Sequence, residues 1–294
     1  MAREPVAEML AHAKKHHYAL GYFESWDLAS LEAAIDAAEK TRSPIIIGFN
    51  GEFLCRGGRA ETARLEWYAA LGQAAAESAK VPCAVMFNEC AVDEAVVRAA
   101  ALGFHLVMLA DEAAPYEDLK GRIAAIEPMA HAFGAAIEAE LGTLPCGVGD
   151  GHAAAALTDP DLAAQFVRDT KVDLLAVSVG NTHIRLQGEG DLDLPHLQAI
   201  RDKLAVPLVL HGGTGISATS IARAIEIGVV KVNYGTYLKQ RCLAAMQQAL
   251  ATDQRNPHER LGFGGESDLL VVTRRAVREA ILERIGVLGC CGKG

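Results

Sequence analysis

The sequence predicts an α/β fold, a (β/α)8 TIM barrel with a C-terminal helical extension. Short apolar runs alternate with segments of helical spacing, and eight such pairs fit into the 294 residues. The runs are continuously apolar, which is typical of parallel strands covered on both faces. This size and repeat favour a single barrel domain over residues 1–294. A doubly wound open sheet is the alternative, but no G-x-G-x-x-G motif follows an early strand.

The expected strands are apolar runs of four to eight residues that helical patterns separate. They cover residues 18–23, 44–49, 82–87, 105–110, 135–141, 172–179, 207–210 and 229–233. Because the chain must return to the same end after each strand, we expect the strands to be parallel and the helices to cover them.

The expected helices follow from apolar spacing and from residues that can begin a helix. Leu28 and Leu31 start a pattern of helical period, and Thr158 or Asp159 can cap a helix in which Pro160 suits the first turn. The helices cover residues 28–40, 61–79, 92–102, 115–133, 195–204, 217–227, 236–250 and 266–286, with one more from about 160. The Gly- and Ala-rich stretch 142–157 is too long for an ordinary connection, so we expect a functional loop, such as a lid, or disorder.

Composition excludes several classes of function. The net charge is −9 without a long basic run, which argues against nucleic acid or an anionic membrane as a partner. No apolar stretch approaches the roughly 20 residues of a membrane helix, and residues 1–15 lack the apolar region of a signal peptide. Seven scattered cysteines indicate reduced thiols, and Cys290 and Cys291 are either tail thiols or an adventitious metal site. We therefore expect a cytoplasmic protein.

The stretch 207–215, P-L-V-L-H-G-G-T-G, is the clearest indication of a functional site. A buried strand ends in His211, and a glycine turn follows before the helix expected from 217. Glycines let the backbone come close to a ligand, and N–H groups beside a helix N-terminus suit an anion. A tight turn needed only for packing is the competing interpretation of the glycines.

Other expected strands also end in polar residues that could meet His211 at one barrel mouth. Asn88 and Glu89 follow the third strand, Glu138 and Glu140 lie on the fifth, and the sixth leads to His183. Two neutral imidazoles and a carboxylate can hold Zn²⁺ or a similar divalent metal. Spacing alone leaves open that either histidine is only structural.

Seven segments carry a resemblance to a known family: Y-A-L-G-Y-F (18–23), R-S-P-I-I-I (42–47), I-E-A-E-L-G (137–142), L-T-D-P (157–160), D-L-L-A-V-S-V-G-N-T-H (173–183), P-L-V-L-H-G-G-T-G (207–215) and K-V-N-Y-G-T (231–236). In order and spacing they resemble the class II fructose-bisphosphate aldolases, most of all the tagatose-bisphosphate and ketose-bisphosphate branch. The resemblance runs from about residue 6 to about residue 287.

The resemblance implies a (β/α)8 barrel with a divalent metal, usually zinc, held by three histidines. The metal polarises the carbonyl of dihydroxyacetone phosphate and stabilises the enediolate formed on cleavage. By motif position, His183 and His211 look like the second and third ligands. The residues that look like the phosphate grip are Gly212, Gly213, Thr214, Asn233 and Thr236.

The chain departs from the family where the chemistry is expected. The family's third strand ends L-H-L-D-H-G, with an acid/base aspartate followed by the first metal ligand, whereas this chain has V-M-F-N-E-C. Asn88 therefore replaces the aspartate and cannot accept a proton at neutral pH. Glu89 replaces the histidine, and it can bind the metal, act as a base, or be a solvated carboxylate at the barrel rim.

Three further positions differ from the family pattern. Glu24 stands where the family has a substrate-contacting asparagine, and Ile184 replaces a glycine of the phosphate and monovalent-cation site. The loop motif G-G-x-E-D is C-G-V-G-D here, so Gly149 replaces the proton-donating glutamate while Asp150 remains. The candidates for proton transfer are therefore Glu24, Glu89 and Asp150.

The leading hypothesis is a divalent-metal-dependent aldolase that uses Zn²⁺, Mn²⁺ or Co²⁺, with a monovalent cation as a further expected ligand. Its substrate would be a phosphorylated ketose or related sugar phosphate other than fructose 1,6-bisphosphate. An epimerase or isomerase working through the same enediolate, and a ligand-binding relative without catalysis, are the alternatives. Family members are usually homodimers or homotetramers, so we expect one of these assemblies.

Overall fold

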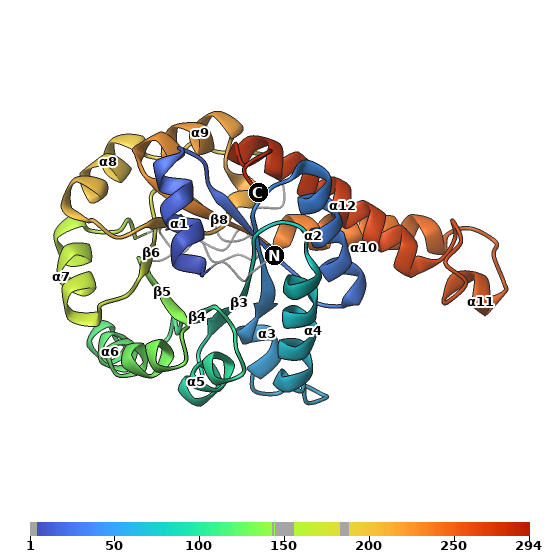
Figure 1. The fold of residues 1–294 in the computed structure, drawn as a ribbon, viewed down its shortest axis with the longest axis horizontal. Coiled ribbons are helices and arrows are strands. Elements are labelled where there is room, and N and C mark those ends of the chain that lie inside the picture. Colours follow the sequence, from blue (N-terminus) through green and yellow to red (C-terminus); the bar gives the residue numbers. More distant parts are fainter. Residues whose placement is uncertain (1–4, 143, 145–155, 183–187) are drawn as a thin grey trace.

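The protein is an eight-stranded barrel that helices surround (Figure 1). A computed structural model describes residues 5–142, 144, 156–182 and 188–294. Within these residues the strands are all parallel, and they close in sequence order from the first strand to the eighth, which pairs back with the first. The predicted (β/α)8 barrel is confirmed, and so are the helices that extend it at the C-terminus.

All eight predicted strands are present, with ends that differ from the prediction by at most three residues. Nearly every strand residue is buried, as expected of strands covered on both faces. The strands are β1 (Leu20–Glu24), β2 (Ile45–Asn50), β3 (Cys83–Cys90), β4 (Leu106–Leu109), β5 (Ala136–Leu141), β6 (Leu174–Val177), β7 (Leu208–Leu210) and β8 (Val229–Tyr234).

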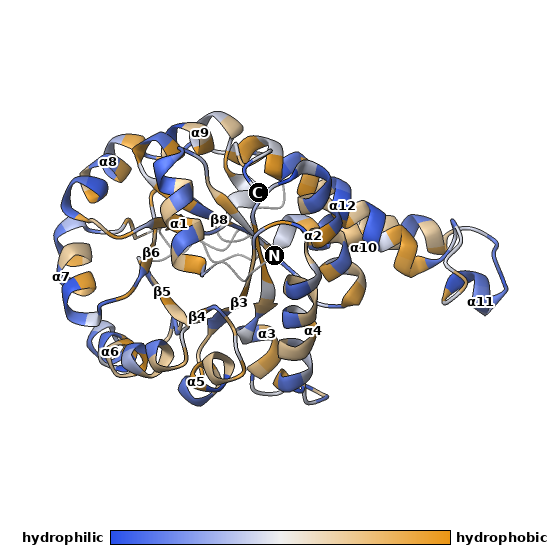
Figure 2. Ribbon diagram, viewed as in Figure 1, coloured by the Kyte–Doolittle hydropathy of each residue, from blue (hydrophilic) through white to orange (hydrophobic). Residues whose placement is uncertain are grey.

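The helices between the strands also follow the prediction, and Asp159 caps its helix by accepting a hydrogen bond from Leu162 N at 2.8 Å. In Figure 2 the outer helices carry hydrophobic and hydrophilic residues along different sides. The helices are α1 (Val6–Lys15), α2 (Leu28–Thr41), α3 (Gly51–Cys55), α4 (Leu65–Ser78), α5 (Asp93–Ala101), α6 (Tyr116–Ala132), α7 (Pro160–Thr170), α8 (Leu194–Lys203), the 3-10 turn η1 (Gly213–Gly215), α9 (Ala218–Ile227), α10 (Thr236–Leu250), α11 (Pro257–Arg260) and α12 (Leu269–Leu288).

Three helices, α1, α3 and α11, were not predicted. The last two have only five and four residues, which is too short for a helical period to stand out. The α3 helix also begins directly at the end of β2, where Asn50 caps it by accepting a hydrogen bond from Phe53 N at 3.3 Å. This placement brings α3 to the carboxyl end of the barrel.

A β-bulge in β3 aims two successive side chains into the barrel. The pairing with β4 shifts by one residue between Phe87 and Cys90, so β3 carries one more residue than its partner there. Glu89 takes up the extra length with a left-handed backbone, φ 51°. In a regular strand Asn88 and Glu89 would face opposite sides, but the bulge removes that alternation.

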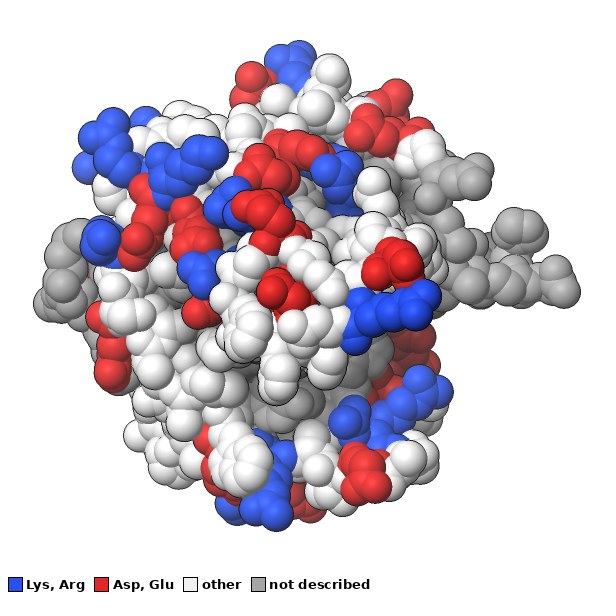
Figure 3. Space-filling view, turned by 90° about the vertical axis from the view of Figure 1, so that its right-hand side faces the viewer, with Lys and Arg blue, Asp and Glu red and all other residues white. Residues whose placement is uncertain are grey.

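The C-terminal helices α10 and α12 extend to one side of the barrel and carry α11 at their far end (Figure 1). Near the barrel α12 is held to α2 by Arg274, whose Nε and Nη2 atoms contact the Asp36 carboxylate at 2.7 and 2.9 Å. Acidic and basic side chains are interspersed on the face shown in Figure 3. Among the helices that the structure describes, none has both the length and the apolar character needed to cross a membrane.

Candidate active site

A cavity of about 270 Å³ opens at the carboxyl ends of the strands. Parallel strands all end at this mouth, so residues far apart in the sequence meet there. Polar residues from β1, β2, β3 and β8, from the turn after β7 and from the start of α10 form most of its wall. The lining residues are Tyr22, Glu24, Asn50, Phe53, Asn88, Glu89, Gly212, Thr214, Asn233, Tyr234, Gly235, Thr236, Lys239, Gln240 and Leu243.

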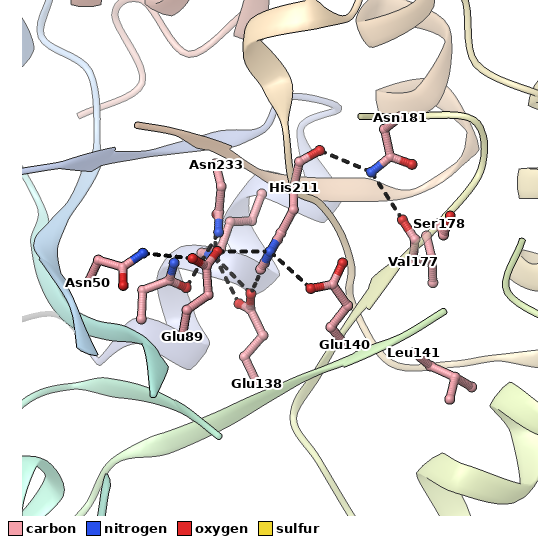
Figure 4. A network of polar contacts seen from close by, with 12 residues as sticks. Asn50, Glu89, Glu138, Glu140, Leu141, Val177, Ser178, Asn181, His211 and Asn233 are labelled. Atoms are coloured by element: carbon pink, nitrogen blue, oxygen red, sulfur yellow. Dashed lines mark hydrogen bonds and ion pairs between the residues drawn. The ribbon is translucent and has the colours of Figure 1, made fainter. Parts of the chain in front are cut away.

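His211 is buried at the centre of a group of carboxylates (Figure 4). Its Nε2 atom lies 2.9 Å from Glu138 Oε1, and Glu89 and Glu140 lie on the other side of the ring. Burial by itself disfavours the charged imidazole, but the three carboxylates outweigh it and raise the pKa of His211 to about 10. With these neighbours alone, the imidazole carries a proton at neutral pH.

The surroundings of the His211 Nδ1 atom indicate whether a divalent cation fits this site. Among the described residues it has no hydrogen-bond partner, while Glu89 Oε1 lies 3.2 Å away and Glu140 Oε2 lies 3.4 Å away. Two ligands at about 2.1 Å from a tetrahedral cation are themselves about 3.4 Å apart. The described residues hold no ready-formed group of three ligands. The spacing of these nitrogen and oxygen atoms nevertheless suits a cation bound between them in place of the proton.

Glu138 is fully buried behind His211 and is held by a buried lysine. Lys231 Nζ lies 2.9 and 3.1 Å from the two Glu138 oxygens, 2.6 Å from Asn233 Oδ1, and 5.3 Å from the centre of the Tyr22 ring. Burial would raise the pKa of the Glu138 carboxyl, but Lys231 and His211 outweigh it and hold that pKa below its ordinary value. An ionised Glu138 fixes the orientation of the His211 ring.

The bulge residues reach the same centre from β3. Asn50 Nδ2 donates a hydrogen bond to Glu89 Oε2 at 2.7 Å, which leaves Oε1 directed at His211 (Figure 4). Asn233 Nδ2 donates to Asn88 Oδ1 at 3.5 Å. Glu89 is therefore placed either as a cation ligand or as a base, and Asn88 offers only hydrogen bonds.

The glycine turn and the start of α10 form a separate corner, which we call the glycine corner: Gly212, Gly213, Thr214, Asn233 and Thr236. Gly212 adopts a left-handed backbone, φ 66°. A Cβ on Gly213 would come within 2.6 Å of Val232 Cγ1, so only glycine lets the turn lie against β8. The N-cap residue of α10 is Gly235, which has no side chain to cap the helix, and Tyr237 N–H donates to Thr214 Oγ1 at 3.3 Å. N–H groups at a helix N-terminus bind anions.

The wall beside the glycine corner carries an ion pair. Lys239, one turn into α10, contacts Glu24 at the end of β1, and its Nζ lies 4.0 Å from the centre of the Phe53 ring. Glu24 is buried, and a Cβ on Gly235 would lie 2.2 Å from its Oε2 atom. The glycine thus leaves room for the Glu24 carboxylate.

The structure brings most of the predicted site residues to one mouth. Glu24, Asn88, Glu89, His211 and the glycine corner all lie at or beside the cavity. The predicted ligand His183 and the predicted acid Asp150 lie outside the described residues.

Sequence reasoning noted Glu138 and Glu140 but gave them no role, and it missed Asn50, Lys231 and Lys239. Asn50 carried a usable signal, since it directly follows the predicted strand 44–49 as Asn88 follows the predicted strand 82–87. Lys231 carried no such signal, because a lysine within a strand is usually exposed to solvent.

Comparisons with known proteins agree with this geometry. Residues 4–293 match the sequence family "Fructose-bisphosphate aldolase class-II". The chain is 32% identical to "Uncharacterized protein YdjI" of Escherichia coli over 283 residues, which cover 96% of this chain and 95% of that protein. It is 30% identical to "Probable fructose-bisphosphate aldolase" of Bacillus subtilis over 290 residues, which cover 97% and 96%. The crystal structure of the YdjI aldolase from Escherichia coli superimposes with a TM-score of 0.82 at 31% identity, covering 100% of this chain and 99% of that one.

Proposed function

Because the chain belongs to the class II fructose-bisphosphate aldolase family, we propose that it is a divalent-metal-dependent aldolase acting on a phosphorylated ketose. Family membership supports an aldolase-type activity in general. The metal requirement, and a substrate other than fructose 1,6-bisphosphate, are our proposals. The meeting of His211 with Glu89 and Glu140 supports the metal requirement. The presence of Glu24, Asn88 and Glu89 in the cavity wall supports the altered substrate.

We assign the metal site to His211 Nδ1 and Glu89, with Glu140 beside them and with His183 as the second imidazole expected from the sequence. A mixed nitrogen and carboxylate set suits Zn²⁺, and also Mn²⁺ or Co²⁺. A divalent cation bound there would polarise the ketose carbonyl and stabilise the negative charge of the enediolate. Glu138 would hold the His211 ring in the tautomer that presents Nδ1.

The glycine corner is the proposed phosphate site. Its turn and the N-terminus of α10 provide N–H groups, and Thr214 and Thr236 add hydroxyls. Asn233 lies between this corner and Asn88, so its amide can orient the carbonyl end of the substrate. Binding the phosphate here would place the rest of a ketose along β8, β1 and β3.

Cleavage also requires a base for the hydroxyl proton at the bond that breaks. Among the described residues that line the cavity, the carboxylates are Glu24 and Glu89. Asn88 can hold the hydroxyl by a hydrogen bond but cannot take its proton. We therefore propose Glu24 and Glu89 as the proton acceptors, and Asp150, from the sequence, as a donor to the enediolate.

The direct test is an assay of dihydroxyacetone phosphate release from a panel of ketose phosphates. The protein is first treated with a chelator, and Zn²⁺, Mn²⁺ or Co²⁺ is then restored. We expect turnover only with metal, and its absence with every substrate and metal would reject the proposal. Solvent deuterium incorporation without cleavage would instead indicate an epimerase or isomerase, which the replacement of the aspartate by Asn88 favours among the alternatives.

We further propose that the protein is a cytoplasmic homodimer or homotetramer. The helices α10 to α12 extend from the barrel and expose large apolar side chains, which suits contact with another subunit. These side chains are Leu243, Leu250, Leu261, Phe263 and Leu270, with exposed fractions between 53% and 64%. Light scattering at micromolar concentration should give two or four times the mass of 31.2 kDa.

A further inference from the structure

Tyr22 points into the barrel from the middle of β1. Its neighbour Phe23 faces outward, because a Cβ on Gly21 would lie 2.4 Å from the Phe23 ring and 3.0 Å from Leu288 of α12. Successive side chains of a strand face opposite sides, so Tyr22 and Glu24 both face inward. The Tyr22 side chain is 1% exposed, and it lines the wall of the cavity.

Two observations place the Tyr22 ring beside the buried charges of the site. Tyr22 is opposite Asn233 in the register of β1 and β8, so the two side chains lie on the same face of the sheet. Lys231 Nζ lies 5.3 Å from the centre of the Tyr22 ring. Tyr22 is therefore situated between the Lys231–Glu138 pair and the mouth of the cavity.

The hydroxyl of Tyr22 is buried, yet it has no hydrogen-bond partner among the described residues. Such a hydroxyl has lost its bonds to water and has gained none in the protein, so an acceptor oxygen on a ligand would satisfy it. The phenol also keeps its proton. Burial raises the pKa of Tyr22 well above its ordinary value, and the carboxylates of Glu24, Glu89 and Glu138 raise it further. Tyr22 is thus a hydrogen-bond donor and not a base.

The proposed reaction supplies an acceptor for this hydroxyl. When the C–C bond of a ketose phosphate breaks, its electron pair moves toward the former carbonyl oxygen and gives an enediolate. Asn233, which lies on the same face as Tyr22, is the residue proposed to orient that carbonyl. In a buried site a hydrogen bond to developing negative charge is stronger than in water, so a donor placed there favours the enediolate over the ketose.

We propose that Tyr22 is a further catalytic residue, whose hydroxyl donates a hydrogen bond to an enediolate oxygen as negative charge develops on it. The proton stays on Tyr22 throughout, so Glu24 and Glu89 keep the role of base. This inference rests on the proposed function and adds a residue to its machinery.

Tyr22→Phe removes only the hydroxyl, and an enediolate analogue reports its loss without turnover. Phosphoglycolohydroxamate carries a phosphate and a hydroxamate that mimics the two enediolate oxygens, whereas glycerol 3-phosphate carries the phosphate and uncharged hydroxyls. Calorimetry on the Zn²⁺-loaded protein gives both dissociation constants. We expect the variant to bind the hydroxamate about tenfold to a hundredfold more weakly and glycerol 3-phosphate within about twofold of the wild type. In a cleavage assay kcat should fall by a similar factor with KM little changed, because the ketose itself does not make this bond.

The stability of the metal-free protein separates this role from a structural one. Because the Tyr22 hydroxyl has no partner among the described residues, its removal should leave the midpoint of urea denaturation unchanged or slightly higher. Tyr116→Phe is the matched control, since its hydroxyl is also buried without a partner there but belongs to α6, outside the cavity. The control should change neither the midpoint nor hydroxamate affinity. A marked drop in the midpoint for Tyr22→Phe alone would overturn the inference, because the hydroxyl would then be bonded within the free protein.

The outcomes distinguish this inference from the proposed function. Weaker hydroxamate binding by Tyr22→Phe, without cleavage of any ketose phosphate, would uphold the role of Tyr22 toward an enediolate and reject the aldolase. Cleavage together with unchanged hydroxamate affinity and kcat in the variant would overturn the inference and leave the aldolase intact. Failure of the wild-type protein to bind the hydroxamate at millimolar concentration would overturn both, because it would remove the enediolate site.

Discussion

The glycine corner and the side-chain wall beside it (Glu24, Asn50, Phe53 and Lys239) line the same cavity but are built differently. The corner is mainly backbone: a turn that needs glycine at Gly213 and the N–H groups that begin α10. The wall is made of side chains from β1, β2 and α10 that hold one another. A backbone site can persist while the residues around it change, whereas a side-chain site can be altered by a few substitutions. This difference explains how a familiar glycine turn can lie beside an unfamiliar wall.

The largest expected effect comes from His211, which directly precedes the glycine corner and contacts Glu89 and Glu138. Replacing it with alanine removes the Nδ1 atom that the proposed cation needs. Activity should fall by about a thousandfold or more, because a bound cation contributes several kcal/mol to the reaction. Metal content, measured by elemental analysis, should fall in parallel. His258→Ala, which removes an exposed imidazole, is the control. Full metal loading of the His211 variant would contradict the assignment.

Lys231 is buried below the cavity, where it contacts Asn233 and the Tyr22 ring. Of the changes considered, its replacement by methionine should cause the largest loss of stability. Among the described residues, the change leaves the fully buried Glu138 with only His211 as a partner, which we expect to cost about 3–5 kcal/mol in the free energy of unfolding. Urea denaturation measures it. The double variant Lys231→Met, Glu138→Gln also removes the unpaired buried charge, and it should recover part of the lost free energy of unfolding. No recovery would mean that Lys231 acts by packing alone.

The glycine corner can be disturbed separately. Gly213→Ala places a Cβ within 2.6 Å of Val232 and 2.8 Å of Tyr234, which we expect to cost about 1–3 kcal/mol of stability. It should also weaken binding of inorganic phosphate in calorimetry. Gly57→Ala is the matched control, because nothing lies within 4 Å of its Cβ position. Equal effects of the two changes would argue against a rigid corner.

The smallest expected effect concerns the backbone of Glu89. Asparagine tolerates a left-handed conformation better than glutamate, so Glu89→Asn should stabilise the metal-free protein by up to about 1 kcal/mol. The same change should lower Zn²⁺ affinity, because it removes a carboxylate. Denaturation with and without Zn²⁺ measures both effects. A loss of stability in the metal-free protein would show that the contacts of Glu89 with Asn50 and His211 outweigh the strain.

The fold was predictable because each step depends on neighbours in the sequence. Continuous apolar strands, the cap at Asp159 and the turn before α9 are all local patterns. Several strand ends were still misplaced by one to three residues. The bulge was missed because it arises from the pairing of β3 with β4, which the sequence of β3 alone does not reveal. It carries Asn88 and Glu89 beyond the point where the predicted strand stopped.

The candidate site was predictable only in part, for a related reason. His211 and the glycine turn 212–214 are consecutive in the sequence, so their motif can be recognised. The partners of Glu24 and Glu138 lie 215 and 93 residues away, at Lys239 and Lys231, and only the closed barrel brings them together. The proposed roles of His183 and Asp150 remain predictions from the sequence.

The bulge in β3 also has a consequence for engineering and for divergence within this fold. The extra residue is accommodated within one strand pair, so exchanging the side chains at Asn88 and Glu89 requires no rearrangement of the barrel's hydrogen bonds. Two adjacent codons thus set both the side chain that Asn233 contacts and the side chain that faces His211. Libraries randomised at these two codons alone should yield folded barrels with altered chemistry, a short mutational path from one reaction to another.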